Sequence, residues 1–507
     1  MGAPQSLSKR SLVIAGLSTI VEWYDFTLYL YLATLLSRIF YGGGAAGVGH
    51  VLAGFAIAYL MRPLGAIFFG HIGDRHGRRP TMLLSMALMS AAMLATALLP
   101  TQAQAGAAAG WLLLALRCVM AFSVGGEYTG VVAYLLEGAP PGRRGLITSL
   151  ASAASEVGGL LAVALSALTV ALLDEAALAD WGWRIPFLVG PGLAALILLA
   201  RSRIEESPDF LAQRARGSIP AQPLRLSLRA YRPAIGRGFA ISALGSITYY
   251  VGIVYVPSFL IGTGRMGEAD ALTLSTLAAL VVILVTPLVG ALSDRIGRRP
   301  VLVALALAGI ALPALLFALM AEESALGGAL IGAILLAALG GAVSAVGAVT
   351  TAEQFPGEGR LSGLAFGATG ATALFGGLTP YLSHQLTQAS GWASAPGWLI
   401  AIVALASTAQ AATAATGGAD PVTAWNANAG DAATFIKAGD VLATFVPDGA
   451  ARVIEIFIDG RDVALVRPGD ATRIQFEGWP AVQFSGWPSV AVGTFGGRVI
   501  APERATA

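Results

Sequence analysis

The chain has 507 residues, of which 56% are hydrophobic and 12% are charged, and its formal net charge is +2. Its mean hydropathy is +0.73, whereas a soluble domain carries about 25% charged residues. The composition therefore excludes a soluble globular protein, indicates a polytopic membrane protein and does not favour a nucleic-acid partner. The single cysteine, Cys118, excludes an intramolecular disulfide and a multi-cysteine metal site. We expect no cleaved leader, because the first apolar run is too long and contains acidic residues.

Twelve apolar segments are long enough to cross a bilayer as helices, which requires about 20 residues each. In chain order they are 11–37, 48–72, 81–99, 110–136, 145–173, 183–201, 236–262, 271–292, 300–320, 326–351, 361–386 and 393–413. The last is the weakest, because its apolar core extends only from Trp398 to Ala406. The sequence thus predicts an all-α membrane protein with twelve transmembrane helices.

Basic residues are concentrated in alternate loops, which predicts the orientation. With the N-terminus in the cytoplasm, the outer loops contain only Arg38 and Arg265 as basic residues. The longest internal polar stretch, about 202–235, is basic and separates six segments from six. We therefore predict an N-terminal six-helix bundle at 1–201, a cytoplasmic linker at 202–235, a C-terminal six-helix bundle at 236–416 and a small β-rich domain at 417–507.

An internal repeat supports the division into two six-helix halves. GHIGDRHGRRP at 70–80 recurs as GALSDRIGRRP at 290–300, with seven of eleven positions identical. The glycines that open each copy allow close helix approach, and the aspartates can pair with arginines or with the N-terminus of a neighbouring helix. The alternative is that any short inner loop collects arginines. The predicted gating residues are Gly70, Asp74, Arg75, Gly77, Arg78 and Arg79 with Gly290, Asp294, Arg295, Gly297, Arg298 and Arg299.

Six ionisable residues lie inside predicted membrane segments, where each costs about 2.5–3.5 kcal/mol on insertion scales. They are Glu22, Asp25, Arg62, Arg117, Glu127 and Glu156, all in the first half. Glu22 and Glu156 each lie eleven residues from the inner end of their segment, roughly 16 Å deep at 1.5 Å per residue. These groups can meet near the midplane, where transporters of this symmetry bind substrate.

The two arginines are candidates for binding a substrate carboxylate. Arg117 or Arg62 can hold a carboxylate through two parallel hydrogen bonds, which favours an organic anion. The alternative is structural: the arginines neutralise Asp25 and Glu127. The sequence does not choose between these two interpretations.

The acidic residues are candidates for carrying protons, because a buried carboxyl group can bind and release a proton near neutral pH. Asp25, Glu127 and Glu156 are the first candidates, with Glu22 after them. A functional role is favoured for Glu156, because its own helix contains no buried base.

The repeated G-x-x-x-D-R-x-G-R-R loop resembles that of the major facilitator superfamily. VEWYDF at 21–26, RPLGAIFFGHIGDRHGRR at 62–79 and LFGGLTPYL at 374–382 are similar to its metabolite:proton symporter family, and the resemblance covers about 10–410. It implies a multi-pass protein of a bacterial inner membrane that carries carboxylates, shikimate-like acids, or zwitterions such as proline and betaine. The resemblance also implies that protons drive transport by alternating access, with no cofactor.

The chain departs from that family at two places. Met120 and Ala121 stand where the fourth helix usually has Gln-Gly, and Ala368 and Thr369 stand where the eleventh usually has Tyr-Asn. A third comparison favours uptake, since exporters of the superfamily usually have a Gly-Pro motif in the fifth helix and 155–165 contains no proline.

The tail, about 420–507, has a different composition. Alternating runs such as VIEIFIDG and TRIQFEGWP predict short strands in a small soluble β domain. EGWPAVQFSGWPSVAVGTFGG resembles the C-terminal β domain of haemolysin-secretion-type membrane fusion proteins, which act outside the inner membrane. Twelve crossings would instead leave this domain in the cytoplasm. The alternatives are a passenger left by a gene fusion and a docking module for a protein partner.

We therefore expect a proton-coupled importer of a small organic acid. The alternatives are a zwitterion symporter and a non-transporting scaffold or sensor that uses the β domain. An enzyme is not expected, since no nucleophile–base pair or metal-ligand set is present in the sequence. The expected partners are the bilayer, a small-molecule substrate and protons.

Overall fold

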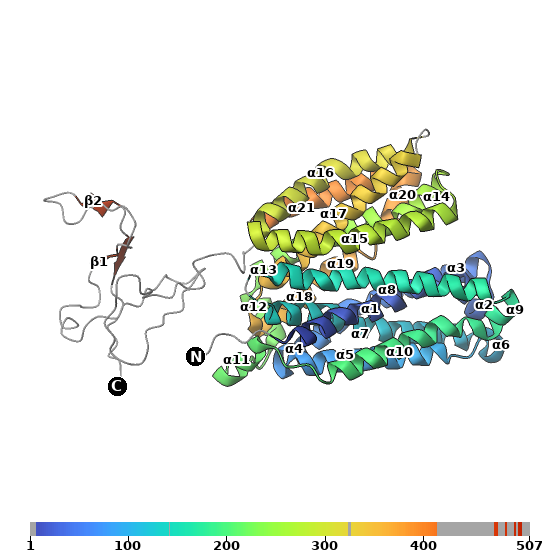
Figure 1. Ribbon diagram of the computed structural model, residues 1–507, viewed down its shortest axis with the longest axis horizontal. Helices are drawn as coiled ribbons and strands as arrows, with labels where there is room; N and C mark the ends of the chain where they lie inside the picture. Colours follow the sequence, from blue (N-terminus) through green and yellow to red (C-terminus); the bar gives the residue numbers. More distant parts are fainter. Residues whose placement is uncertain are drawn as a thin grey trace. The chain divides into compact units, whose positions relative to one another are not determined.

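The computed structural model describes residues 7–140, 142–322 and 326–412, together with short strands at 471–474, 482–483, 491–492 and 495–498. The chain divides into two units, Met1–Ala419 and Asp420–Ala507. The described part of the first unit is helical (Figure 1).

Helices occupy each segment that was predicted to be apolar and helical in the first half. They are α1 (Lys9–Tyr31), α2 (Ala33–Tyr41), α3 (Gly44–Tyr59), α4 (Met61–His76), α5 (Arg78–Ala97), α6 (Gln102–Ala105), α7 (Ala108–Gly138), α8 (Arg144–Leu172), α9 (Glu175–Ala177), the π-helix η1 (Leu178–Gly182) and α10 (Arg184–Arg201). The first two predicted segments are each divided, at Leu32 and at Leu60.

The predicted linker contains two short helices, and the second half follows it. In chain order these are α11 (Pro208–Arg216), α12 (Pro223–Ala230), α13 (Arg232–Tyr249), π-helix η2 (Tyr250–Val254), α14 (Val256–Gly262), α15 (Glu268–Ile296), α16 (Arg298–Ala321), α17 (Leu326–Glu353), 3-10 helix η3 (Gly357–Gly359), α18 (Arg360–Leu364), π-helix η4 (Ala365–Thr369), α19 (Gly370–Phe375), α20 (Thr379–Ser390) and α21 (Ala395–Ala412). Both longer interruptions, η2 and η4, are single π-helical turns, which are frequent at functional sites.

Within the described residues, nine helices are long and apolar enough to cross a membrane, and a tenth span is formed by Arg232–Val254 with Val256–Gly262, bent by 40°. The two remaining predicted segments also contain helices. α1 has two acidic residues in its middle, and α21 is short.

The two repeated loops have the same local structure. Gly77 has φ +113° between α4 and α5, and Gly297 has φ +95° between α15 and α16. This backbone region favours glycine, because a Cβ atom would be strained there. Each loop therefore makes a tight turn between two long helices.

The two halves pack against each other along α8 and α15 and, near the linker, along α4 and α18. A Cβ atom on Gly290 would lie 2.5 Å from Oγ of Ser149, so glycine permits the close approach of α15 to α8. A Cβ atom on Gly70 would lie 3.1 Å from the carbonyl oxygen of Leu361, which makes the approach of α4 to α18 almost as close.

The second unit is described only as four strands. β1 (Ala471–Ile474) pairs antiparallel with β4 (Phe495–Arg498), and β2 (Val482–Gln483) pairs antiparallel with β3 (Ala491–Val492). The remainder of the β domain that the sequence predicted lies outside the described residues.

Candidate functional site

A cavity of about 180 Å³ lies between the two halves of the first unit. Its walls come from α1, α3, α4, α7 and α8 of the first half and from α13, η2, α15, α17, α18, η4 and α19 of the second. Among its described residues, three charged side chains line it, Glu22, Arg62 and Glu156. Pockets for drug-sized ligands have volumes of roughly 300–1,000 Å³, so this cavity suits a smaller molecule.

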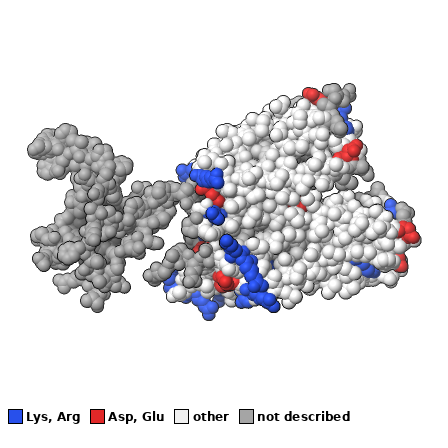
Figure 2. Space-filling model, in the orientation of Figure 1, with Lys and Arg blue, Asp and Glu red and all other residues white. Residues whose placement is uncertain are grey.

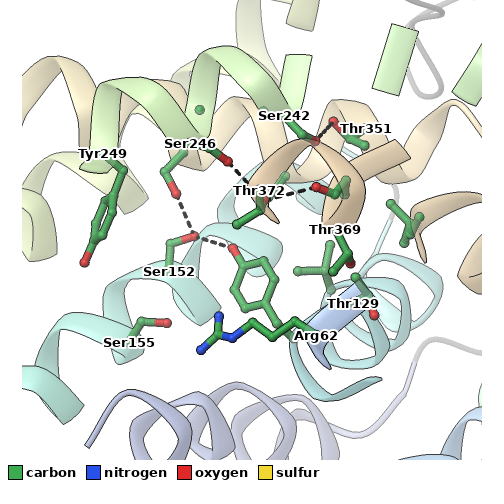
Figure 3. Close-up of a pocket in the computed structure, with 18 of the residues that line it drawn as sticks. Arg62, Thr129, Ser152, Ser155, Ser242, Ser246, Tyr249, Thr351, Thr369 and Thr372 are labelled. Atoms are coloured by element: carbon green, nitrogen blue, oxygen red, sulfur yellow. Dashed lines mark hydrogen bonds between the residues drawn. The ribbon is translucent and has the colours of Figure 1, made fainter. Parts of the chain in front are cut away.

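Arg62 extends into the cavity from the first turn of α4 (Figure 3). Its guanidinium carbon lies 4.9 Å from the ring centre of Phe26 and 4.6 Å from that of Tyr59, and these cation–π contacts hold it in place. Its Nη1 is 3.9 Å from Oε1 of Glu22, which is an ion pair but longer than a charge-assisted hydrogen bond. The pair is therefore loose.

Glu156 lies on α8, in the same first-half wall of the cavity, and is 8% exposed. The hydroxyl of Tyr249, on α13, donates a hydrogen bond of 2.7 Å to its Oε1, which joins the two halves. The ring of Trp23 contacts that of Tyr249 edge-on, with centroids 5.4 Å apart. Glu156 forms no ion pair with any residue in the described part of the chain, so its carboxyl group has a hydroxyl partner and no base.

Asp25 and Arg117 form a tight pair inside the first half. Nη1 of Arg117 donates to Oδ2 of Asp25 at 2.6 Å, and Nη2 donates to Oδ1 at 3.2 Å. The guanidinium carbon lies 5.1 Å from the ring centre of Tyr29. Both residues line a smaller cavity of about 40 Å³ and not the central one. This bidentate geometry occupies the face of Arg117 that a substrate carboxylate would need.

Glu127 lies in neither cavity. Its Oε1 is 2.5 Å from Nη2 of Arg201, and the hydroxyl of Ser85 donates to its Oε2 at 2.7 Å. Arg201 also donates to Ser18 and to the carbonyl oxygen of Met82. Pairing of Glu127 with Arg62 or Arg117, considered from the sequence, is wrong, because Arg201 at the end of α10 is fully buried beside it. The only sequence signal was that Arg201 is the last residue of a predicted span.

At the end of the first unit that carries α11 and α12, which we call the linker end, the repeated loop of the first half contacts the second half. The carboxylate of Asp74 accepts hydrogen bonds from the backbone N–H groups of Leu361 (3.2 Å) and Ser362 (2.8 Å), in the first turn of α18. It also accepts one from Nη1 of Arg78 at 3.0 Å. An anion at a helix N-terminus is stabilised by the unpaired N–H groups and the helix dipole.

Glu137, at the end of α7, extends this contact. Its Oε1 lies 2.9 Å from Nη2 of Arg78 and 2.6 Å from Nη1 of Arg360, which belongs to the second half. Arg360 also pairs with Asp209 on α11, at 3.0 Å. One buried carboxylate thus binds an arginine from each half.

The second repeated loop makes the equivalent contact in the reverse direction. Asp294 accepts hydrogen bonds from the backbone N–H groups of Gly145 and Leu146, both at 2.8 Å, at the start of α8. Arg298 lies 2.8 Å from Asp294 and 3.3 Å from Glu353. Both loops of the repeat therefore hold the two halves together at the linker end.

The other loop residues are at the surface of the same end. Arg75, Arg295 and Arg299 are exposed, and Arg79 donates to the carbonyl oxygen of Ser202 at 2.5 Å. In the view of Figure 2, most of the visible basic side chains of the first unit lie at this end, and a few lie at the opposite end.

Glu206, in the loop after α10, caps the start of α5. Its carboxylate accepts hydrogen bonds from the backbone N–H groups of Arg78, Arg79 and Ser207. Burial nevertheless raises the pKa of Glu206 above its ordinary 4.5, because desolvation outweighs these three bonds.

Neutral hydroxyl groups line the second-half wall of the cavity. They include those of Ser242, Ser246, Tyr249, Tyr250, Thr351, Thr369 and Thr372. Ser242, Thr351 and Thr372 (Figure 3) were not identified as candidates from the sequence. The hydroxyl of Tyr250 also lies 2.7 Å from that of Tyr59, which connects the halves.

No group of three or more His, Cys, Asp or Glu side chains that could hold a metal ion occurs among residues 7–140, 142–322 and 326–412. The polar groups of the central cavity are suited to binding an organic ion or a proton.

Comparison with known proteins agrees with this architecture. The family model described as sugar (and other) transporter matches residues 11–224, and that of the Major Facilitator Superfamily matches residues 265–447. The proline/betaine transporter of Salmonella typhimurium is 31% identical over 412 residues, which cover 78% of this chain and 81% of that protein. The citrate-proton symporter of Klebsiella pneumoniae is 31% identical over 387 residues, which cover 76% and 87%.

Among solved structures, a double-Trp mutant of XylE superimposes with a TM-score of 0.69 at 19% identity, covering 80% of this chain and 96% of that one. This similarity shows a shared fold. Together with the two relatives and the matching models, it identifies the family: the chain belongs to the major facilitator superfamily.

Proposed function

We propose that the chain is a proton-coupled importer of small organic acids. The observation that carries the proposal is the pair of charged groups that the first half contributes to the central cavity: Arg62, which is loosely paired, and Glu156, which has no basic partner among the described residues. The citrate-proton symporter among the relatives supports both an acid as substrate and protons as the driving ion. We further propose twelve crossings of a bacterial inner membrane, with the linker end in the cytoplasm.

Arg62 is the proposed carboxylate-binding residue. Its contact with Glu22 is loose, so an incoming carboxylate can take the place of Glu22 and form two short hydrogen bonds with the guanidinium. Arg117 is already held by Asp25 through two such bonds. We assign Asp25–Arg117 and Glu127–Arg201 to holding the first half together.

Glu156 is the proposed proton carrier. It is buried, it contacts the cavity, and its hydrogen bond to Tyr249 crosses between the halves. Binding or release of a proton at Glu156 therefore changes a contact that must break when the halves move apart. Such a group can link the protonation state to alternating access.

The contacts of Asp74, Glu137 and Asp294 are the proposed cytoplasmic gate. All three carboxylates join residues of one half to residues of the other at the linker end. In this conformation the gate is closed. Alternating access requires these contacts to break when the cavity opens to the cytoplasm.

A zwitterion is the second candidate substrate. The rings of Trp23 and Tyr249 lie beside Glu156, and aromatic faces with a nearby carboxylate can bind a quaternary ammonium group. The proline/betaine transporter among the relatives supports this alternative. Competition by glycine betaine, with no competition by carboxylic acids, would favour it. The tail beyond residue 419 has no part in either proposal.

The test is uptake of labelled mono-, di- and tricarboxylates and betaine into proteoliposomes with an imposed pH gradient. Arg62→Ala should lower acid uptake more than a hundredfold, because two charge-assisted hydrogen bonds contribute ~1.5–3 kcal/mol each. Arg62→Lys keeps the charge and should retain part of the uptake. Glu156→Gln should permit exchange of substrate but make uptake independent of the pH gradient. No uptake of any acid under a gradient would refute the proposal.

A further inference from the structure

The three charged side chains of the cavity all belong to the first half. The wall that the second half contributes contains no charged side chain among its described residues. Arg62 is the one cation among the described residues that line the cavity. A ligand that binds Arg62 through one carboxylate therefore finds no second cation at its other end. A second carboxylate would instead meet a neutral wall and lie in the same cavity as Glu22 and Glu156.

The hydroxyl groups of this wall are joined in pairs between helices. Ser246 on α13 donates to Oγ1 of Thr372 on α19 at 3.0 Å, and Thr372 donates in turn to the carbonyl oxygen of Ala368 at 3.0 Å. The hydroxyls of Ser242 and Thr351 lie 3.4 Å apart, also between two helices (Figure 3).

These bonds determine what the wall can offer to a ligand. A hydroxyl has one hydrogen and two lone pairs. Ser246 and Thr372 already use their hydrogens, and Thr372 also accepts the bond from Ser246, so the oxygen of Ser246 retains two lone pairs and that of Thr372 retains one. A ligand hydroxyl can donate to them, whereas a carboxylate cannot donate. The positive charge of an ammonium group placed against this wall would find no carboxylate there to pair with.

Two glycines keep space open beside these hydroxyls. A Cβ atom on Gly245 would come no closer than 4.0 Å to Cγ1 of Val343, and one on Gly347 no closer than 3.7 Å to Cγ2 of Ile241. Both glycines line the cavity. A glycine inside a helix costs ~1 kcal/mol relative to alanine, and helix packing does not require it at either position. The space therefore belongs to the cavity.

We propose that the wall formed by Ser242, Ser246, Thr351 and Thr372 is a hydroxyl-binding subsite, and that the substrate is a hydroxylated monocarboxylate. This inference rests on the proposed function, in which Arg62 binds the carboxylate. The substrate lies with its carboxylate at Arg62 and its hydroxyl groups toward α13 and α19. Ala368 and Thr369, which replace the Tyr-Asn pair usual in the resembling family, leave room for them.

The test uses six-carbon acids that differ in one feature at a time. Gluconate has one carboxylate and hydroxyls along its chain, glucarate adds a second carboxylate, and hexanoate lacks the hydroxyls. Galactonate, and in addition quinate, which is a cyclic seven-carbon acid, provide other hydroxyl arrangements. Binding to the purified full-length chain is measured by calorimetry. At least one of gluconate, galactonate and quinate should bind ten times or more tighter than glucarate and hexanoate, a difference of ~1.4 kcal/mol or more.

Variants of the wall give the matched controls. The double variant Ser246→Ala with Thr372→Val should remove the tenfold preference and leave hexanoate binding unchanged, which also shows that the variant is folded. Gly245→Ala should weaken binding of the hydroxylated acid, whereas Gly236→Ala, on the same helix but with open space around it, should not.

Equal or tighter binding of glucarate or hexanoate would overturn the subsite, as would an unchanged preference in the double variant. Either result can occur while acid uptake under a pH gradient is intact, so failure of the subsite is distinguishable from failure of the proposed function.

Discussion

Removal of the Asp294 carboxylate tests the proposed gate most directly. In the closed linker end this group accepts two backbone hydrogen bonds of 2.8 Å, from Gly145 and Leu146 of the other half. Hydrogen bonds to a charged group contribute ~1.5–3 kcal/mol each. Because water can replace the carboxylate at this partly exposed helix end, we halve the sum to about 1.5–3 kcal/mol. Asp294→Ala should therefore shift the closed-to-open ratio by up to about a hundredfold.

The assay is the distance between spin labels on the two halves at the linker end. His76 and Ile296 are exposed and lie at the ends of α4 and α15, so His76→Cys with Ile296→Cys in a Cys118→Ser background provides the labels. Asp294→Ala should add a population of longer distances. Asp294→Asn retains one carbonyl acceptor and should produce a smaller shift, about tenfold.

Glu205→Ala is the control, because it removes an exposed carboxylate from the same end of the molecule. It should leave the distances unchanged. If Asp294→Ala is folded and gives the same distance distribution as the parent, the hydrogen bonds at the start of α8 do not hold the gate, and the reasoning is refuted.

Three further predictions concern stability. Gly125→Ala should lower the thermal midpoint strongly or prevent folding, since its Cβ would overlap the backbone carbonyl oxygen of Arg62; Gly236→Ala should have little effect. Arg201→Met should cost ~3–5 kcal/mol by leaving Glu127 buried without its cation, and addition of Glu127→Gln should recover part of it in a denaturation series. Because burial raises the pKa of Glu206, its contribution to the free energy of unfolding should be complete below pH 4.5 and decline as pH rises through the folded-state pKa; an unchanged pH slope in Glu206→Gln would contradict this.

The positions of the helices were predictable because length and apolarity determine them. The segment predicted at 300–320 is Arg298–Ala321, and that at 110–136 is Ala108–Gly138. The break at Leu60 has a sequence signal in Pro63, because a proline cannot donate a hydrogen bond to the carbonyl oxygen four residues earlier. The break at Leu32 was not predictable, since no proline or glycine lies within four residues of it.

The charged residues inside the helices of the first half could be identified because each is an exception in an apolar segment. Their partners could not, since partner choice depends on which helix faces which: Glu127 pairs with Arg201, more than seventy residues away. The hydroxyl wall gave no signal either. Serine and threonine are common in membrane helices, where they usually bond to their own backbone, so Thr351 and Thr372 look ordinary in the sequence.

The π-helical turns η2 and η4 both lie in the second half, and both contribute residues to the cavity, Tyr250 and Thr369 among them. The π-helical turn of the first half, η1, contributes no residue to it. A π-helical turn can change helix curvature by moving one residue in or out of the hydrogen-bond ladder. The first half contains the buried ion pairs Asp25–Arg117 and Glu127–Arg201, which connect several of its helices. When a ligand fills the cavity, we therefore expect the first-half helices to keep their positions. The second-half helices next to the π-helical turns, α13 and α19, should change their curvature, by an amount that depends on the shape of the ligand.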